Sequence, residues 1–327
     1  MNPDSALCTL RPLCLRASSK YRLAVSQRGV TLIELMISLA LGLLIVLAST
    51  SLFLSTKNAY TAADDATHVD DTGRFALEIV SRSVRQAAYV NWDRNDAPAV
   101  VMPGMSPSIE GLDAHSLKAS TGGMTSPQAQ AVNGSDVLSV QFFGAADGTM
   151  LNCAGFPIAQ GQRGASVFYV GTDATGEPQL YCKYPGETSW GADAVARGVE
   201  AFQILYGLDT DNDGMPDRLL NASAIKTLDD ASIGTAESSA RNAKTHWKKV
   251  VALNIAFLVR GSANAGTGDV AAADAYDLFG KEYSEQHGAD DQGVRLRKED
   301  LPASARNRYR KVFSTTIQLR NTVDGAD

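Results

Sequence analysis

The sequence has few cysteines and histidines, the residues that most often bind transition metals. Its 327 residues include only four cysteines, no Cys-x-x-Cys spacing occurs, and the four histidines are scattered along the chain. Zinc sites need such residues in clusters, so the sequence does not support one. It also has no nucleophile elbow, phosphate loop, zinc-protease helix or dinucleotide fingerprint. We therefore do not expect an enzyme.

Basic residues and proline are missing from one long stretch near the N-terminus. No basic residue occurs between Arg28 and Lys57, and no proline between Pro12 and Pro98. The segment 30–54 is almost wholly apolar, with the sequence VTLIELMISLALGLLIVLASTSLFL. As a helix, the 28 residues without a basic side chain would extend ~42 Å, more than the ~30 Å of a hydrocarbon core. This run predicts a membrane-spanning helix.

The charge pattern predicts which side of the membrane each part occupies. Residues 1–29 hold one acidic residue and five basic ones, while the whole chain has a net charge of −6. A basic flank before an apolar run stays on the cytoplasmic side. We expect a single-pass membrane protein whose basic N-terminal flank lies in the cytoplasm and whose acidic body lies on the other side of the membrane. The acidic balance gives no reason to expect a specific nucleic-acid partner.

One acidic residue interrupts the apolar run. Glu34 lies five positions into it, and a charged side chain at membrane depth costs roughly 2.5–3.5 kcal/mol on insertion scales. A plain signal anchor has no use for such a residue. If the chain were cut after Gly29, the new amine of Val30 on a neighbouring subunit could neutralise it.

The residues around this position resemble a known processing motif. Gln27-Arg28-Gly29-Val30-Thr31-Leu32-Ile33-Glu34-Leu35-Met36 is similar to the N-terminal motif of type IV prepilins and type II secretion pseudopilins. The resemblance implies cleavage between Gly29 and Val30 by a prepilin peptidase, N-methylation of Val30, and an assembly role for Glu34. Three departures are Val30, where major pilins usually have Phe, the long leader, and the absence of the proline that major pilins carry within the apolar helix.

The helix is expected to continue beyond the membrane. Residues 57–90 contain one glycine and no proline, and Leu77, Val80, Val84 and Ala88 recur at helical spacing. An apolar stripe of this kind packs against a sheet. The alternative is two helices with a hinge near Asp64-Asp65 or at Gly73.

The remaining residues predict a β-rich head. Strands are expected where Val, Ile, Phe and Tyr concentrate between turn residues, namely Val137–Phe143, Ser166–Val170, Gln179–Tyr184, Val199–Gly207, Val250–Arg260 and Val312–Arg320. The stretches Gly104–Pro127 and Gly261–Asp277 are expected to be loops. The predicted fold class is α+β: a long N-terminal helix, half membrane-spanning and half amphipathic, packed on an antiparallel sheet in the manner of pilins.

These expectations divide the chain into four parts. They are a basic leader at 1–29, a transmembrane assembly helix at 30–56, the amphipathic half of that helix at 57–97, and the periplasmic head at 98–327.

Two cysteines lie in this head. Cys153 and Cys182 can oxidise if the head lies outside the cytoplasm, closing a loop worth ~3–4 kcal/mol in the chain-entropy model. The alternative is two buried free thiols.

An aspartate-rich segment in the head has the spacing of a calcium loop. In Asp209-Thr210-Asp211-Asn212-Asp213-Gly214-Met215-Pro216-Asp217, alternate carboxylates converge when a glycine permits the sharp turn. The twelfth position is Leu220 rather than Glu, which excludes an EF-hand. Bound calcium, held by Asp209, Asp211, Asp213 and Asp217, and a solvated turn remain alternatives.

Three further segments resemble PilW-type minor pilins. They are the helix end from Gly73 to Tyr89, where Ala88 replaces a common glycine, the segment from Gly198 to Asp217, and the C-terminal segment Arg310–Asn321. The resemblance implies a minor pilin that helps start type IV pilus assembly, sits at or near the pilus tip, and supports motility, adhesion or DNA uptake. Its implied partners are the major pilin, other minor pilins, a tip adhesin and the prepilin peptidase/N-methyltransferase.

Three alternatives remain open. The chain could be a minor pseudopilin of a type II secretion system, a calcium-dependent binding head on a pilin stem, or a membrane-anchored periplasmic enzyme. The basic segments Lys248-Lys249 and Arg306–Lys311 could touch DNA or lipid headgroups, although such runs are more often solvated flanks.

Overall fold

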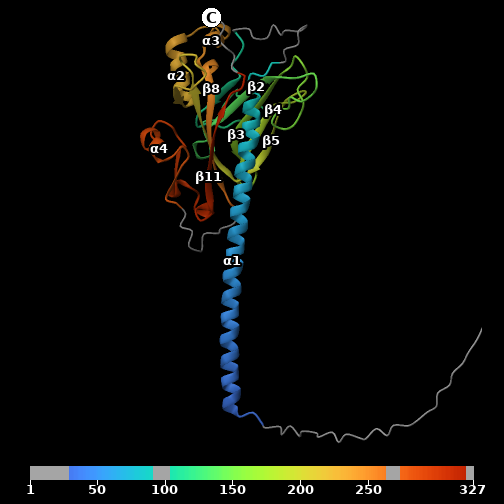
Figure 1. Ribbon diagram of the computed structural model, residues 1–327, viewed down its shortest axis with the longest axis vertical. Helices are drawn as coiled ribbons and strands as arrows, with labels where there is room; N and C mark the ends of the chain where they lie inside the picture. The colour runs from blue at the N-terminus through green and yellow to red at the C-terminus, as the bar shows by residue number, and fades with distance from the viewer. Residues whose placement is uncertain (1–28, 91–103, 263–272, 322–327) are drawn as a thin grey trace, which may run out of the picture. The chain divides into compact units, whose positions relative to one another are not determined.

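A computed structural model of the chain describes residues 29–90, 104–262 and 273–321. The leader residues 1–28, with Cys8 and Cys14, and the expected helix end at 91–97 lie outside these ranges. The chain forms two compact units, residues 1–54 and 55–327. Figure 1 labels the helices and several of the strands.

The described part of the first unit is helical and apolar. Helix α1 spans Leu32–Arg85 without a break, and its large apolar side chains between Val30 and Leu54 are all exposed. Among the described residues, α1 is the one helix that is both long enough and apolar enough to cross a membrane. The expected continuation of the helix beyond the apolar run is confirmed, and the alternative of a hinge near Asp64-Asp65 or at Gly73 does not occur.

In the second unit, α1 buries a narrow face against the sheets. Val69, Gly73, Ala76, Val80 and Val84 are buried, at the three- and four-residue spacing of one helix face. Gly73 lies directly against the ring of Phe313, where a β carbon would come 2.3 Å from the ring. The small residues therefore allow the helix to approach closely. The buried face is rotated from the predicted stripe, and Leu77 is only half-buried.

The head consists of three antiparallel sheets. The five-stranded sheet has the order β1-β2-β3-β4-β5, the four-stranded sheet the order β11-β8-β6-β7, and β10 pairs with β9. The strands of the five-stranded sheet are β1 (Ile109–Leu112), β2 (Val137–Phe143), β3 (Arg163–Thr172), β4 (Pro178–Pro185) and β5 (Trp190–Arg197). The others are β6 (Val199–Leu208), β7 (Arg218–Leu220), β8 (Val250–Arg260), β9 (Ala275–Asp277), β10 (Arg295–Arg297) and β11 (Arg310–Gln318).

Helices of the head lie in the connections. They are α2 (Ala222–Ile233), α3 (Ser238–Lys244) and α4 (Lys281–His287), with 3₁₀ turns at Val132–Gly134, His246–Lys249, Lys298–Asp300 and Ala303–Ala305. Asn221 caps α2 through a hydrogen bond from the amide of Ala224, 2.9 Å long. The α+β fold class with antiparallel sheets is thus confirmed.

The central strands explain where the core lies. Every residue of β6 is buried, as are all but one residue of β8, so these strands are covered on both faces. The stacked rings of Phe202 and Phe257 join them, with centroids 4.7 Å apart. The main apolar cluster contains residues of α1, of β6 and β8, and of the five-stranded sheet. The two large sheets and the helix therefore share one core (Figure 1).

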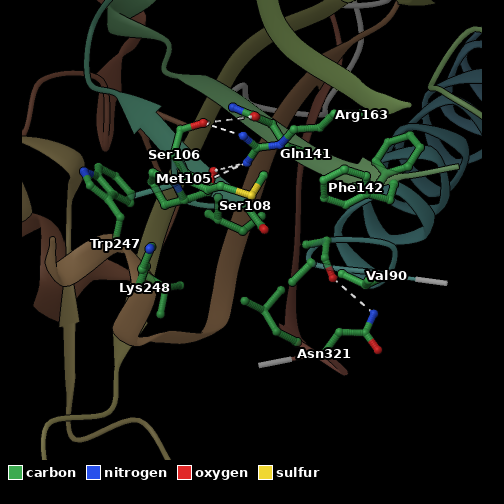
Figure 2. A pocket seen from close by; sticks show the side chains of 17 residues that line it. Val90, Met105, Ser106, Ser108, Gln141, Phe142, Arg163, Trp247, Lys248 and Asn321 are labelled. Carbon is green, nitrogen blue, oxygen red and sulfur yellow. Dashed lines mark hydrogen bonds between the residues drawn. The ribbon is translucent and has the colours of Figure 1, made fainter. Parts of the chain in front are cut away.

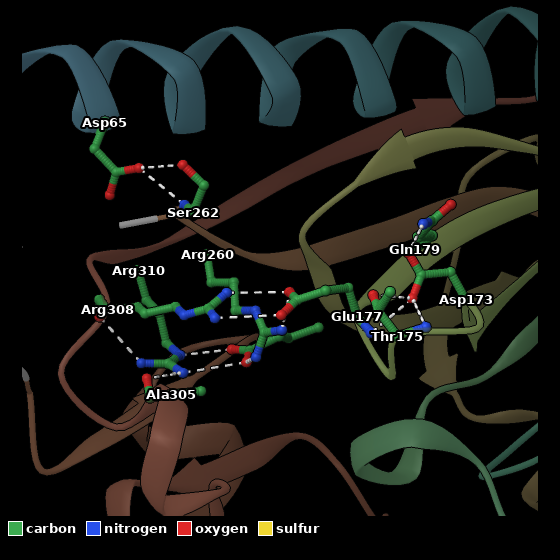
Figure 3. Close-up of polar contacts among 11 residues, drawn as sticks. Asp65, Asp173, Thr175, Glu177, Gln179, Arg260, Ser262, Ala305, Arg308 and Arg310 are labelled. Atoms are coloured by element: carbon green, nitrogen blue, oxygen red, sulfur yellow. Dashed lines mark hydrogen bonds and ion pairs between the residues drawn. The ribbon is translucent and has the colours of Figure 1, made fainter. Parts of the chain in front are cut away.

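A buried ion-pair network fastens the strand ends (Figure 3). Glu200 of β6 accepts hydrogen bonds from Arg260 of β8 at 2.7 Å and from Arg310 of β11 at 2.5 Å and 3.1 Å. Glu177, in the turn between β3 and β4, binds both Arg260 and Arg308. The network links the five-stranded sheet to three strands of the neighbouring sheet. It also holds Arg308 and Arg310, two of the four basic residues in the run Arg306–Lys311, in internal ion pairs.

Polar contacts from α1 reinforce the same region. Asp65 accepts a hydrogen bond of 2.9 Å from the amide of Ser262, just beyond β8. Asp70 pairs with Lys311 of β11 at 2.7 Å. These contacts fix which part of the helix faces the beginning of β11.

Two loop predictions need correction. The stretch Gly104–Pro127 contains β1, because Ile109 and its neighbours pair with Val137–Val140 of β2. β9 lies at the end of the predicted loop Gly261–Asp277, most of which is outside the described residues.

Candidate assembly and binding sites

The start of α1 holds the predicted processing and assembly residues. Gly29 and Val30 precede the helix, and Glu34 lies in its first turn. The amide and hydroxyl of Thr31 both donate to the Glu34 carboxylate at 3.3 Å, and the Glu34 amide donates to the Thr31 hydroxyl at 3.3 Å. This reciprocal pair is a capping box. Within the chain itself, Glu34 therefore satisfies backbone groups at the helix N-terminus.

The capping role of Glu34 also has a signal in the sequence. A Thr followed three residues later by Glu, just before an apolar run, is the sequence signature of a capping box. Both side chains are exposed, so a group from another molecule can reach the carboxylate. Glu34 thus combines a local role in the helix start with access for an assembly partner.

The two head cysteines form a disulfide. Cys153 and Cys182 are bonded, with their Cα atoms 5.9 Å apart. The bond ties the connection between β2 and β3 to the centre of β4. Both residues are buried, and the prediction of a disulfide is confirmed over that of free thiols.

The aspartate-rich segment forms the turn between β6 and β7. Asp209 is buried and accepts hydrogen bonds from the amides of Asn212 at 2.6 Å and Gly214 at 2.8 Å. Asp217 accepts from the amide and hydroxyl of Thr210, both at 2.6 Å. These hydrogen bonds from Thr210 hold the pKa of the exposed Asp217 below its usual range. The carboxylates therefore organise the turn themselves.

Three of the four predicted calcium ligands gather. One oxygen from each of Asp209, Asp211 and Asp217 lies within 4.8 Å of the others. Calcium ligands lie ~2.3–2.6 Å from the ion, so two of them are at most about 5 Å apart. The gathered oxygens therefore fit a calcium ion in spacing and in chemistry. Asp213 is not in this group, and its carboxylate accepts a 2.7 Å bond from the amide of Met215.

The comparisons with known proteins identify two regions. Residues 167–321 match the model of the family described as type IV pilus-assembly protein W. Residues 25–50 match the prokaryotic N-terminal methylation motif. No curated protein matches the chain.

One solved structure is similar at low identity. It is a type IV-like pilin from Thermus thermophilus, 14% identical, with a TM-score of 0.33 over 80% of this chain and 97% of that chain.

The two family matches agree with the geometry. The methylation motif covers Gly29, Val30, Glu34 and the apolar start of α1, and the pilus-assembly match runs from β3 through β11. The family consists of structural, non-enzymatic pilus components that assemble with other pilins. Together, the pilus-assembly match over the second half of the chain and the methylation motif at its start support a type IV pilus minor pilin of the PilW type.

Proposed function

We propose that this minor pilin helps to initiate type IV pilus assembly and sits at or near the pilus tip. There it supports pilus-dependent motility, adhesion or DNA uptake. The observation that carries the proposal is the exposed Glu34 carboxylate at the start of α1, whose large apolar side chains are all exposed as far as Leu54. Such a helix needs partner helices to cover it outside a membrane, and a carboxylate in an apolar bundle needs a cation.

In the proposed mechanism, the prepilin peptidase cuts between Gly29 and Val30, and Val30 is then methylated. Before assembly the chain is held in the inner membrane by residues 30–54, with the head in the periplasm. On assembly, Glu34 pairs with the N-terminal amine of a neighbouring pilin, and the helix enters the core of the extracellular fibre. The neighbours are the major pilin and other minor pilins, and a tip adhesin joins the head.

The size of the head supports a role as a subunit that is present in few copies per pilus. The second unit comprises residues 55–327, a large body to repeat along a fibre. A subunit that starts the fibre stays at its end and meets no such packing restriction. This argument favours the tip over the shaft.

The test replaces Glu34 in the full chain, expressed in its native cell. Glu34→Gln keeps an oxygen that can cap the helix but removes the charge, whereas Glu34→Ala removes both. We expect both variants to lose pili, counted by electron microscopy, because the missing charge is what the partner amine needs. Glu78→Ala, an exposed acidic position in the same helix, is the control and should retain pili. Normal piliation by Glu34→Ala would contradict the proposal.

The related role as a type II secretion pseudopilin predicts a different phenotype. Deletion of the gene would then abolish protein secretion and leave twitching motility intact. Lost twitching with normal secretion is the result that our proposal predicts. A membrane-anchored enzyme, by contrast, would keep its activity in the Glu34→Ala variant.

A second proposal concerns calcium. The gathering of Asp209, Asp211 and Asp217 favours a calcium ion that stiffens the turn between β6 and β7, so that the head acts as a calcium-dependent binding module. Thermal unfolding of the full chain in detergent should then shift upward with calcium, and Asp211→Asn and Asp217→Asn should abolish the shift. Asp290→Asn, at an exposed position elsewhere, is the control. No shift in the unchanged chain would mean a solvated turn.

A further inference from the structure

A small cavity opens where the end of α1 meets both large sheets (Figure 2). Its volume is about 70 Å³. The apolar part of its wall comes from five segments of the chain, with Val90 after α1, Ile109, Phe142, Trp247, Val250 and Leu319. A ligand in this cavity would contact the helix end and both sheets at once.

A guanidinium group lies on one wall of the cavity. Arg163 of β3 donates to the hydroxyl and the carbonyl of Ser106, both at 2.6 Å, and more weakly to the Pro107 carbonyl at 3.4 Å. All three acceptors are neutral. Within the described residues, Arg163 forms no ion pair. The cavity therefore has a cation that is held in position but not neutralised at contact distance.

Lys248 adds a second cationic side chain to the lining. Burial lowers the pKa of Lys248, and the charge of Arg163 lowers it further. Burial also lowers the pKa of Arg163, against the opposing effect of Glu110. Each of these shifts means that the charged form is disfavoured where it stands. An anion placed between the two cations would reduce this cost.

The apolar walls and the size limit what can enter. A volume of about 70 Å³ admits a single side chain but not a lipid tail. The apolar wall favours an aliphatic or aromatic side chain, and the two cations favour a carboxylate next to it. Peptide segments with an apolar residue beside Asp or Glu have both features.

We propose that this cavity is a docking site for a neighbouring pilin, which inserts an apolar side chain and places an adjacent carboxylate between Arg163 and Lys248. The inference rests on the proposed function, since it requires the chain to enter pili. The cavity is a contact site on the head. It is distant in the sequence from Glu34, which makes a separate contact at the start of α1. The end of α1 and both sheets would then be held together by the bound segment.

A cysteine placed on the cavity wall can report occupancy. Ser108 lines the cavity and is half-buried, and Ser108→Cys changes the side chain little. Cys153 and Cys182 are bonded to each other, so a membrane-impermeant maleimide would label the new thiol in the head. Labelling is compared by mass spectrometry between sheared pili and membranes from cells that lack the other pilins. Ser189→Cys, exposed before β5 at the opposite edge of the sheet, is the control.

We expect Ser108→Cys to react about tenfold more slowly in pili than in membranes, while Ser189→Cys reacts equally in both. Adding Arg163→Met or Lys248→Met should remove this protection, and Arg163→Lys should retain it because the charge remains. Lys244→Met, an exposed cation on α3, should have no effect. Having two separate charge variants keeps the test valid if one of them fails to fold.

Each contrary result has its own meaning. Equal labelling of Ser108→Cys in pili and membranes would overturn the docking site while leaving the proposed function intact. Protection that persists in Arg163→Met and Lys248→Met would overturn the claim that the docking segment places a carboxylate between these two residues. Protection already present in membranes would mean a lipid or a second copy of this chain in the cavity, and would overturn the proposal. If the chain were absent from sheared pili, the proposed function itself would fail.

Discussion

Glu200 and Arg310 form a two-point ion pair in the interior of the head, through hydrogen bonds of 2.5 Å and 3.1 Å. The side chains are 1% and 0% exposed. Because Arg260 also binds Glu200, one carboxylate holds the ends of three strands. The charge of Glu200 therefore faces two cations that are themselves buried, with side chains 6% and 0% exposed.

Glu200→Gln should be strongly destabilising. Removing one partner of a buried ion pair leaves an uncompensated charge and costs about 3–5 kcal/mol. Chemical unfolding of the full chain in detergent measures this loss. The matched control is Glu299→Gln, whose partner Arg297 is 3.5 Å away and mostly exposed, and which should change stability by less than about 1 kcal/mol. Equal effects of the two substitutions would contradict the account of the network.

Gly73→Ala should disrupt the packing of α1 on β11. The added β carbon would lie 2.3 Å from the Phe313 ring, and overpacking of this kind costs about 1–3 kcal/mol. The double variant Gly73→Ala/Phe313→Leu should recover part of the loss, because the smaller side chain makes room. Gly42→Ala is the control, since a β carbon there meets no atom. The midpoint of thermal unfolding of the head is compared among the three variants. An unchanged midpoint in Gly73→Ala would refute the close contact.

Ala88→Gly should stabilise the head. Ala88 has a φ of 57°, a left-handed conformation that costs a residue with a β carbon about 1–2 kcal/mol and costs glycine little. This geometry also explains why a glycine is common at this position in the proteins the segment resembles. Thermal unfolding should show an increased midpoint for Ala88→Gly. The neighbouring Ala87→Gly should not show it, and an unchanged or lower midpoint for Ala88→Gly would contradict the prediction.

The stability of the head should fall as the pH rises from about 4.5 towards 7. Burial raises the pKa of Glu110 to about 7, against the lowering effect of Arg163 and with a further increase from Asp229. The folded state therefore binds a proton that the unfolded state has released. The stabilisation from this proton is fully present below the pKa of Glu110 in the unfolded state. It is lost as the pH rises through the pKa of Glu110 in the folded state.

The Glu110→Gln variant measures this contribution. Its unfolding midpoint should depend less on pH over this interval than that of the unchanged chain, because glutamine does not titrate. Asp193, an exposed acidic residue on β5, provides the control Asp193→Asn. Parallel pH profiles for the unchanged chain and Glu110→Gln would refute the raised pKa.

Much of the fold could be predicted because its central strands have unambiguous patterns. The continuous apolar run of β8 was predicted with its observed bounds, Val250–Arg260, and the β2 prediction likewise coincides with Val137–Phe143. By contrast, β5 was missed because its sequence, WGADAVAR, is rich in residues with low β propensity. Helix α2 was also missed, although Asn221 and Gly234 flank it with ordinary capping signals.

The site residues also differ in how well the sequence alone could predict them. Gly29, Val30 and Glu34 are close in the sequence, and the cysteine pair followed from compartment and number. Asp213 was included among the calcium ligands because alternate spacing is all that a sequence shows, whereas the structure turns its carboxylate to the Met215 amide. The cavity beside Arg163 could not be predicted, because its wall is assembled from segments far apart in the chain.

The most direct test of the central claim is the N-terminal residue of the protein in sheared pili, identified by mass spectrometry. The account predicts a chain that begins at an N-methylated Val30, with Glu34 five residues into the mature protein. A chain that enters pili normally with residues 1–29 still attached would contradict it.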